Sequence, residues 1–489
     1  MKKRKVGWRL PQLILLLLMT DLILASCRSG SDGKQSAEPA TIKVMYWNEQ
    51  SFQNEYGNVF YALNPHIETV VASTGGIQLS EGDYNEKLDE LIRNEKPDIL
   101  LLNQEQYEKY AKEGRLVSLE SYITRDKINL DELIPGMVDM LREKSGGELY
   151  GLASYFYSQA VFYNKDLFDR HGIEYPTDRM SWEDLLNLAA RFPTDGEGED
   201  RIYGLYAGLS AGGSEVQDLA RQIGLTYGLR LLNPADKRVS IDTDSWANVY
   251  EMAVNAVRSG ALYKSESPNF GGAMMYQDFL LQDPFVSGKV AMSINTSYLV
   301  SQLREAASIV PDKAIKNWDV VTMPVDPANP DFTYSMTFND IFAINAESTN
   351  PDAAWEFIRF TIGDDYARVK SRAFIGQFPV RTKYIRDDEG RNIAAFYTLK
   401  PSGADLYQGF EDIPPLFNMQ FYTIGNEEMQ AVLNDEKSVK EALASMQTRL
   451  QAALDAALEN GGIMLPELPP LDGSIQFEIP AVTEDVTEE

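Results

Sequence analysis

Aromatic and amide side chains follow the ends of several predicted β-strands. Trp47 and Asn48 come directly after a β-prone run. Asn103 and Gln104 follow a short apolar run in the same way. An aromatic ring can stack against the C–H face of a sugar ring, and amide or carboxylate groups can pair with its hydroxyls. These residue types could therefore bind a polyhydroxylated ligand if the fold gathers them at one place.

The elements that must position these side chains alternate between strands and helices. The run 41–47 predicts a strand, and apolar residues within 84–92 recur at helical spacing. The apolar run 99–102 is typical of a buried parallel strand, and a helix is expected over 105–114. Further strands are expected at 160–163, 290–294 and 320–323, and further helices at Ser181 and Asn350. The pattern predicts an α/β fold with two lobes.

The first 27 residues have the pattern of an export signal. A cationic head precedes an apolar stretch, and the run Leu24-Ala25-Ser26-Cys27 looks like a bacterial lipobox. In a lipobox the cysteine thiol receives a diacylglyceryl group and becomes the new N-terminus. The apolar stretch is short for a bilayer span, which disfavours a transmembrane helix. Residues 1–26 are therefore predicted to be removed, and Cys27 to tether the protein to the outer side of the cell membrane.

Composition excludes several classes of function. A net charge of −28 disfavours nucleic acid and anionic lipid as partners, since both need basic patches. The single cysteine cannot form an internal disulfide, and two histidines, His66 and His171, leave little room for a zinc site or a histidine-based triad. No cofactor is expected. Residues 27–40 are predicted to be a flexible linker, and 466–489 an acidic tail.

Several segments, in order, resemble the family 1 extracellular solute-binding proteins, the lipoprotein receptors of bacterial ABC sugar importers. Maltose-binding protein is a distant relative in this family. The most specific match is Val161-Phe162-Tyr163-Asn164-Lys165-Asp166-Leu167-Phe168, followed by His171-Gly172-Ile173 and Ser181-Trp182-Glu183-Asp184-Leu185. Weaker matches lie at 96–100, 114–119, 287–292, 317–324, 350–358 and 378–381. Together they span most of the mature chain.

The resemblance implies two α/β lobes joined by crossing strands at a hinge, with the ligand in the cleft between them. The N-terminal lobe would comprise 41–156 and 327–376, and the C-terminal lobe 157–326 and 377–465. It also implies a monomeric receptor that binds a carbohydrate, for which an oligosaccharide is expected, and delivers it to the permease subunits of an ABC importer. Membrane contact would be through the lipid alone.

The resemblance also suggests which residues touch the ligand. In relatives the loop that corresponds to Trp47 and Asn48 touches the ligand. The alternative for Trp47 is that its side chain packs into the core. Tyr298 matches a position where a tryptophan often stacks on the sugar. Tyr155 and Tyr157 lie at the expected first crossing, where aromatic packing that stiffens the hinge is the alternative. The remaining candidates are Tyr276, Asn339, Asp340 and Gln377, the last at a loop that can close on the ligand.

Two other interpretations remain open from sequence. The acidic run 195–200 resembles a calcium loop of some relatives, but its spacing is degraded, so a solvated turn is preferred. A secreted carbohydrate-active hydrolase would need only two carboxylates at a suitable separation. The sequence contains no phosphate loop of the G-x-x-x-x-G-K-[ST] type. A purely structural lipoprotein would not explain aromatic and amide residues at strand ends.

Overall fold

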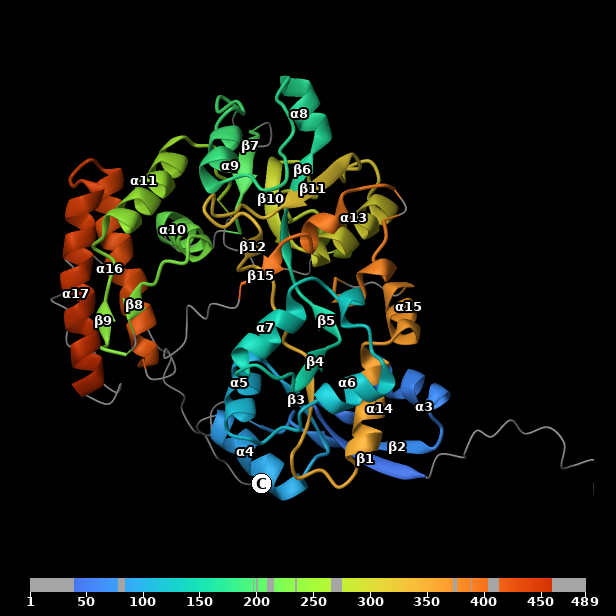
Figure 1. Cartoon of the computed structure of the whole chain (residues 1–489). Helices are drawn as coiled ribbons and strands as arrows, with labels where there is room; N and C mark the ends of the chain where they lie inside the picture. The colour runs from blue at the N-terminus through green and yellow to red at the C-terminus, as the bar shows by residue number, and fades with distance from the viewer. Residues whose placement is uncertain are drawn as a thin grey trace, which may run out of the picture. The chain divides into compact units, whose positions relative to one another are not determined.

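A computed structural model describes residues 39–77, 84–196, 198, 201–208, 215–233, 235–264, 275–372, 376–387, 389–402 and 413–459 (Figure 1). The predicted signal sequence, Cys27 and the acidic tail lie outside the described residues. The chain divides into two compact units. The first comprises the residues up to Leu100 together with Glu347–Phe357, and the second comprises Leu101–Ala346 and the residues from Ile358 onward.

The first unit is a strand–helix–strand layer. Strand β1 (Ala40–Tyr46) pairs in parallel with β2 (Ile67–Ser73) and with the start of β3 (Ile99–Leu102). The helices of this unit are α2 (Glu49–Phe52), the π-helix η1 (Gln53–Gly57), α3 (Asn58–Leu63), α4 (Tyr84–Glu95) and the first part of α14 (Pro351–Thr361). The strands predicted at 41–47 and 99–102 and the helix predicted around 84–92 are therefore confirmed.

A buried carboxylate fixes the start of β3. Asp98 is almost fully buried, and its Oδ2 accepts a 2.8 Å hydrogen bond from Lys43 N of β1. Its Oδ1 accepts a 2.6 Å bond from Ser348 Oγ. Both oxygens are thus paired, as a buried charged group requires. The bonds hold β3 in register beside β1 and place the residues before α14 next to that strand.

The second unit contains a four-stranded mixed sheet with the order β11–β6–β10–β7. Its strands are β6 (Gln159–Asn164), β7 (Tyr203–Tyr206), β10 (Val290–Thr296) and β11 (Trp318–Thr322). Strand β6 is antiparallel to both β10 and β11, whereas β10 and β7 are parallel. All three strands predicted in this region are confirmed, but the sheet is not uniformly parallel.

Side-chain caps begin two helices of the second unit. The helix start predicted at Ser181 is confirmed: its Oγ accepts a 3.0 Å bond from Asp184 N, and the Asp184 carboxylate accepts one from Ser181 N. Asn164 ends strand β6 and caps the helix that follows it, because its Oδ1 accepts from Asp166 N at 3.1 Å.

The second unit contains many further helices and strands. Its other helices are α5 (Gln104–Lys112), α6 (Glu120–Asp126), η3 (Leu130–Glu132), α7 (Met137–Lys144), α8 (Lys165–His171), α9 (Trp182–Ala189), α10 (Glu215–Thr226), α11 (Asp244–Arg258), α12 (Tyr276–Leu280), α13 (Tyr298–Ile309), α15 (Asp364–Arg372), η5 (Thr382–Tyr384), η6 (Ile393–Phe396), α16 (Pro415–Leu433) and α17 (Val439–Glu459). Its other strands are β4 (Gly151–Ala153), β5 (Tyr155–Phe156), β8 (Leu232–Asn233), β9 (Arg238–Val239), β12 (Phe332–Thr333), β13 (Ile341–Ile344), β14 (Phe378–Pro379) and β15 (Lys400–Pro401).

The two long helices α16 and α17 pack against each other and against α10 and α11 (Figure 1). A buried amide joins two of these helices, because Gln217 Nε2 of α10 donates a 3.2 Å bond to the carbonyl of Phe421 in α16. The hydroxyl of Tyr250 in α11 donates to Gln217 Oε1. Burial raises the pKa of the Tyr250 phenol, so this group remains a neutral donor. The network fixes three helices relative to one another.

This network predicts that Gly425→Ala destabilises the protein. A Cβ at Gly425 would lie 1.6 Å from Gln217 Nε2, and the buried, doubly bonded amide cannot move aside. Overpacking of this kind costs about 1–3 kcal/mol, while alanine in a helix returns about 1 kcal/mol. We expect a lower melting temperature by calorimetry. Thr423→Ala, on the exposed side of the same helix, is the control; an equal effect of both substitutions would contradict the argument.

Candidate functional site

The segment 376–387 of the second unit positions several of the predicted site residues. Its residues Phe378 and Pro379 form β14, which pairs antiparallel with β5. The next residue, Val380, donates a 3.1 Å backbone bond to Ser154 O and accepts a 2.7 Å bond from Ile134 N. The segment is therefore held on both sides by backbone bonds. These bonds fix the place of Gln377, which directly precedes β14.

Gln377 and Tyr157 are brought together although 220 positions separate them in the chain. The side-chain amide of Gln377 donates a hydrogen bond to the Tyr157 hydroxyl. Tyr157 is in turn fixed by two backbone bonds with Thr337, of 3.0 and 2.9 Å. Both side chains remain partly exposed. An ordered amide–phenol pair of this kind presents further donors and acceptors in a defined geometry.

Tyr298 lies directly beside this pair. It is the first residue of α13, its side chain is 55% exposed, and its backbone lies against Gly376. The preceding residue, Ser297, donates from Oγ to the carbonyl of Gly376. Because Gly376 and Gln377 are neighbours in the chain, Tyr298 is adjacent to the Tyr157–Gln377 pair. The exposed ring is free to stack on a ligand.

Tyr276 is a further aromatic residue close to Tyr298. It begins α12, which packs against α13, and is 52% exposed. A hydrogen bond to the Glu305 carboxylate raises the pKa of the Tyr276 phenol, with burial and the charge of the same carboxylate adding to the effect. We refer to Tyr157, Tyr276, Tyr298 and Gln377 as the tyrosine cluster. Four predicted site residues thus form one group.

One exposed aromatic residue near the cluster was not predicted. Phe279 stacks on Tyr276, with ring centroids 6.1 Å apart and an interplanar angle of 20°. Its side chain is also largely exposed. The signal that could have revealed it is the spacing of the two aromatic residues, which places them on one face of a helix. The pair widens the exposed aromatic surface beside the cluster.

Tyr155 is placed differently from Tyr157. Its side chain is 3% exposed, and its hydroxyl shares a hydrogen bond with that of Tyr366. The two rings lie 5.7 Å apart between centroids. This placement agrees with the alternative in which aromatic residues stiffen the crossing strand, and it leaves no open ring face for a ligand.

Asn339 and Asp340 lie between Thr337, which pairs with Tyr157, and strand β13. Asn339 is exposed and Asp340 is partly buried. They are therefore two and three residues beyond the bridge between Tyr157 and Thr337. Each carries polar side-chain atoms of the kind that pair with the hydroxyl groups of a ligand.

In the first unit, Trp47 lies on the surface. It follows β1 and is 58% exposed, so the alternative that it packs into the core is wrong. Its carbonyl accepts bonds from Gly75 N at 2.9 Å and from Ser73 Oγ at 2.8 Å. The neighbouring Asn48 caps α2, because its Oδ1 accepts a 2.8 Å bond from Ser51 N. Trp47 is thus presented by a fixed backbone.

Asn103 and Gln104 occupy the start of α5. Asn103 forms a capping box with Gln106, accepting from its backbone N at 2.8 Å and donating from its own N to the Gln106 side chain at 3.1 Å. Gln104 differs, because its Nε2 is buried and has no hydrogen-bond partner among the described residues. A buried unpaired donor is costly, so this amide is the one that would gain most from a ligand acceptor.

The acidic run 195–200 is described only in part, and within the described residues no group of three His, Cys, Asp or Glu side chains could hold a metal ion. Among the helices that the structure describes, none is both long and apolar enough to cross a bilayer.

The bond between Gln377 and Tyr157 predicts the effect of a conservative change. Tyr157→Phe removes the acceptor and leaves a partly buried amide donor without its partner, at a cost of about 0.5–1.5 kcal/mol. We expect a melting temperature lowered by a few degrees in a thermal denaturation scan. Tyr61→Phe, at an exposed tyrosine of the first unit, should leave it unchanged. An unchanged melting temperature for both variants would show that the bond does not form in solution.

The chain is similar in sequence to known bacterial binding proteins. The model of the bacterial extracellular solute-binding protein family matches residues 38–368. A binding protein of Brucella abortus is 28% identical over 309 residues, covering 61% of this chain and 68% of that protein. The mannitol-binding protein of Pseudomonas aeruginosa is 25% identical over 356 residues, covering 71% of this chain and 74% of that protein.

Solved structures show the same fold. The sugar-binding protein MalE of Xanthomonas citri superposes with a TM-score of 0.59 at 19% identity, covering 87% of this chain and all of that one. A sugar transporter protein of Rhizobium etli, in an open conformation, gives a TM-score of 0.58 at 20% identity, with 84% and 99% covered. The predicted α/β, periplasmic-binding-protein-like fold class is confirmed. The chain belongs to the bacterial extracellular solute-binding protein family.

Proposed function

We propose that this solute-binding protein captures a carbohydrate outside the cell and delivers it to the permease subunits of an ABC importer. The observation that supports the proposal best is the tyrosine cluster. Three tyrosines and an amide from distant parts of the chain meet there, and two of the rings are more than half exposed. Exposed rings beside ordered polar groups are what a pyranose needs, with its C–H face and its rim of hydroxyls.

Within the cluster the roles divide by chemistry. The Tyr298 ring is the stacking platform, and the Tyr276 ring, backed by Phe279, is a second one. The Gln377 amide donates to Tyr157, so its carbonyl oxygen is oriented to accept from a sugar hydroxyl. Trp47, Gln104, Asn339 and Asp340 are proposed as further contacts: Trp47 and Asn339 are exposed, Asp340 is partly exposed, and Gln104 has an unpaired donor.

Three of the sequence candidates are weaker contacts on the same reasoning. Tyr155 is buried against Tyr366, and the side-chain oxygens of Asn48 and Asn103 are occupied in capping helices. A ligand would have to compete with those bonds. We therefore assign these residues to the structure around the site.

The names of relatives favour a sugar or polyol as the ligand. A relative binds mannitol, and a Listeria monocytogenes protein of the same fold was solved in complex with cycloalternan (TM-score 0.53). An oligosaccharide is our proposed ligand class, because two exposed ring platforms can stack on more than one sugar unit. No nucleic acid partner is proposed, since the chain has a net charge of −28.

The proposed location follows from the N-terminus. Residues 1–26 would be removed by cleavage before Cys27, and the Cys27 thiol would be lipidated. The linker 27–40 would then let a monomeric receptor reach a permease at the membrane. In the proposed cycle the ligand binds the closed state best and shifts the population toward it, and the importer recognises that state. In this proposal the lobes are 41–156 with 327–376 and 157–326 with 377–465, and closure occurs at the hinge between them.

A carbohydrate-active hydrolase is the alternative function. It would need two carboxylates flanking the bond to be cleaved. The tyrosine cluster instead presents phenols and an amide, and the Glu305 carboxylate beside it is engaged by Tyr276. These groups suit reversible binding better than acid–base catalysis.

The first test is a thermal-shift screen of plant and microbial oligosaccharides, maltose, mannitol and cycloalternan. A ligand at one hundred times its dissociation constant stabilises the folded state by about 2.7 kcal/mol, so a cognate sugar should raise the melting temperature by several degrees. Solution scattering should show compaction, and chromatography should show the sugar intact. Accumulation of shorter products would support the hydrolase instead, and no shift with any sugar would refute a carbohydrate ligand.

The second test is Tyr298→Ala. Loss of a central stacking ring typically costs about 2 kcal/mol, or roughly 30-fold in affinity. We expect this loss by isothermal titration with the sugar that gives the largest shift, with a normal circular dichroism spectrum. Tyr61→Ala is the matched control, because Tyr61 is similarly exposed but lies in the first unit, on α3. Wild-type affinity in the Tyr298 variant would remove this residue from the site.

A further inference from the structure

The contact between Gly376 and Tyr298 is unusually close. Gly376 has φ +106°, a conformation that residues with a side chain rarely adopt. A Cβ built on Gly376 would lie 2.8 Å from Tyr298 Cα, 3.0 Å from its Cβ and 3.1 Å from its Cδ2. The backbone of segment 376–387 therefore lies directly against the first residue of α13. Any side chain at this position would have to displace Tyr298, the segment, or both.

A hydrogen bond also joins Ser297, the residue before Tyr298, to Gly376. Ser297 is almost fully buried, and its Oγ donates to the carbonyl of Gly376. The Ser297 backbone N also donates a 3.3 Å bond to Ser158 O, next to Tyr157. The start of α13 is thus joined both to the segment that contains Gln377 and to Ser158, the residue that follows Tyr157.

An ion pair forms a second contact between α13 and the segment 376–387. Arg304 of α13 forms a 2.8 Å ion pair with Asp387 at the end of the segment. Burial would raise the pKa of Asp387, but bonds from Arg391 and Arg304 outweigh it and lower the pKa below its usual value. The carboxylate is therefore charged at neutral pH. The helix and the segment are joined at both ends of their contact.

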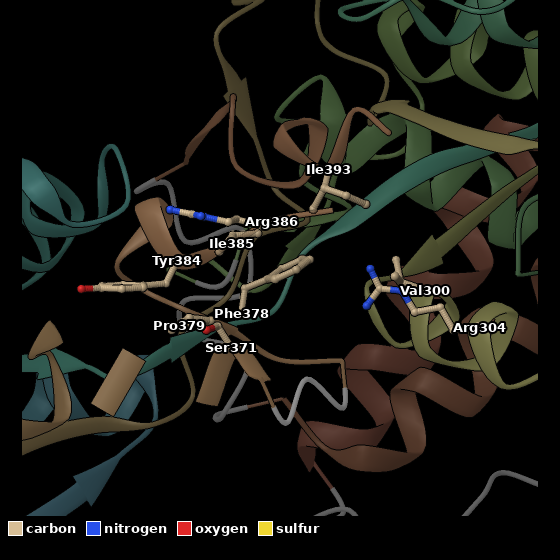
Figure 2. A pocket seen from close by; sticks show the side chains of 9 residues that line it. All are labelled: Val300, Arg304, Ser371, Phe378, Pro379, Tyr384, Ile385, Arg386 and Ile393. Atoms are coloured by element: carbon tan, nitrogen blue, oxygen red, sulfur yellow. The ribbon is translucent and has the colours of Figure 1, made fainter. Parts of the chain in front are cut away.

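Between these two attachments lies a small cavity (Figure 2). Its lining comes from α13, the end of α15, the segment 376–387 and η6: Val300, Arg304, Ser371, Phe378, Pro379, Tyr384, Ile385, Arg386 and Ile393. Its volume of about 30 Å³ has room for about two water molecules, so it is not a sugar pocket. The middle of the contact between α13 and the segment is therefore incompletely filled, whereas at Gly376 the segment lies directly against Tyr298.

We propose that Gly376 is a positioning residue for ligand binding, which acts by holding the Tyr298 ring in its binding orientation beside Gln377. The inference rests on the proposed function, because it takes Tyr298 to be the stacking platform. The absence of a side chain lets the backbone approach Tyr298, and the bond from Ser297 keeps it there. Gly376 itself needs no contact with the sugar.

A double-mutant cycle tests whether Gly376 acts through Tyr298. Affinities for mannitol, maltose and cycloalternan are measured for the wild type, Gly376→Ala, Tyr298→Ala and the double variant. We expect Gly376→Ala to lower affinity at least tenfold in the wild-type background and less than twofold in the Tyr298→Ala background. Equal losses in both backgrounds, or no loss in either, would overturn the proposal.

Two further variants separate positioning from general damage. Gly172→Ala is the matched control, because Gly172 also has a positive φ, of +62°, but a Cβ there would meet nothing within 4 Å. It should leave affinity unchanged. Ser297→Ala removes only one hydroxyl and serves if Gly376→Ala does not fold. It should lower affinity in the wild-type background and not in the Tyr298→Ala background, and any other pattern counts against the proposal.

A measurement without ligand separates this proposal from the proposed function. With 3-fluorotyrosine incorporated, the fluorine resonance that disappears in Tyr298→Phe belongs to Tyr298. We expect Gly376→Ala to shift this resonance and Gly172→Ala to leave it in place. If no sugar of the thermal-shift screen binds the wild type but the resonance shifts, the carbohydrate assignment fails and the positioning of Tyr298 by Gly376 stands. An unshifted resonance would refute the positioning itself.

Discussion

The candidate site depends on one constraint: the segment 376–387 must lie against both β5 and the start of α13. The contact with β5 is formed by the backbone pairing of β14. The contact with α13 requires a glycine at 376, since a Cβ there would lie 2.8 Å from Tyr298 Cα. Gln377 lies between these two contacts, so its bond to Tyr157 is formed by residues that are already positioned. The tyrosine cluster is therefore fixed by backbone geometry before any ligand arrives.

Much of the fold could be predicted because the signals are local. The apolar run 99–102 and the capping box at Ser181 form the elements that their patterns indicate. Strand direction could not be predicted in the same way, because the antiparallel pairing of β6 with β10 and β11 depends on distant partners. The long helix α16 was missed, since its weakly amphipathic sequence packs on several sides against α10, α11 and α17.

The candidate site could be predicted in type but not in detail. Tyr155 and Tyr157 are two positions apart in one aromatic run, yet Tyr155 is buried against Tyr366 while Tyr157 meets Gln377. Sequence alternation would place both on one face of a strand. The strand ends between them, however, and Tyr157 pairs with Thr337 instead. Whether an asparagine caps a helix or meets a ligand is likewise decided by tertiary contacts, as Asn103 illustrates.

The chemistry of the tyrosine cluster favours an uncharged ligand. Its polar groups are phenols and an amide, and the Glu305 carboxylate beside Tyr276 raises the pKa of that phenol, so the phenol stays protonated at neutral pH. Neutral donors and acceptors satisfy hydroxyl groups well, but they do not offset the cost of taking a charged group out of water. An anionic sugar would also meet the Glu305 carboxylate and a chain with net charge −28. Neutral saccharides and polyols are therefore the ligands that this surface can desolvate at least cost.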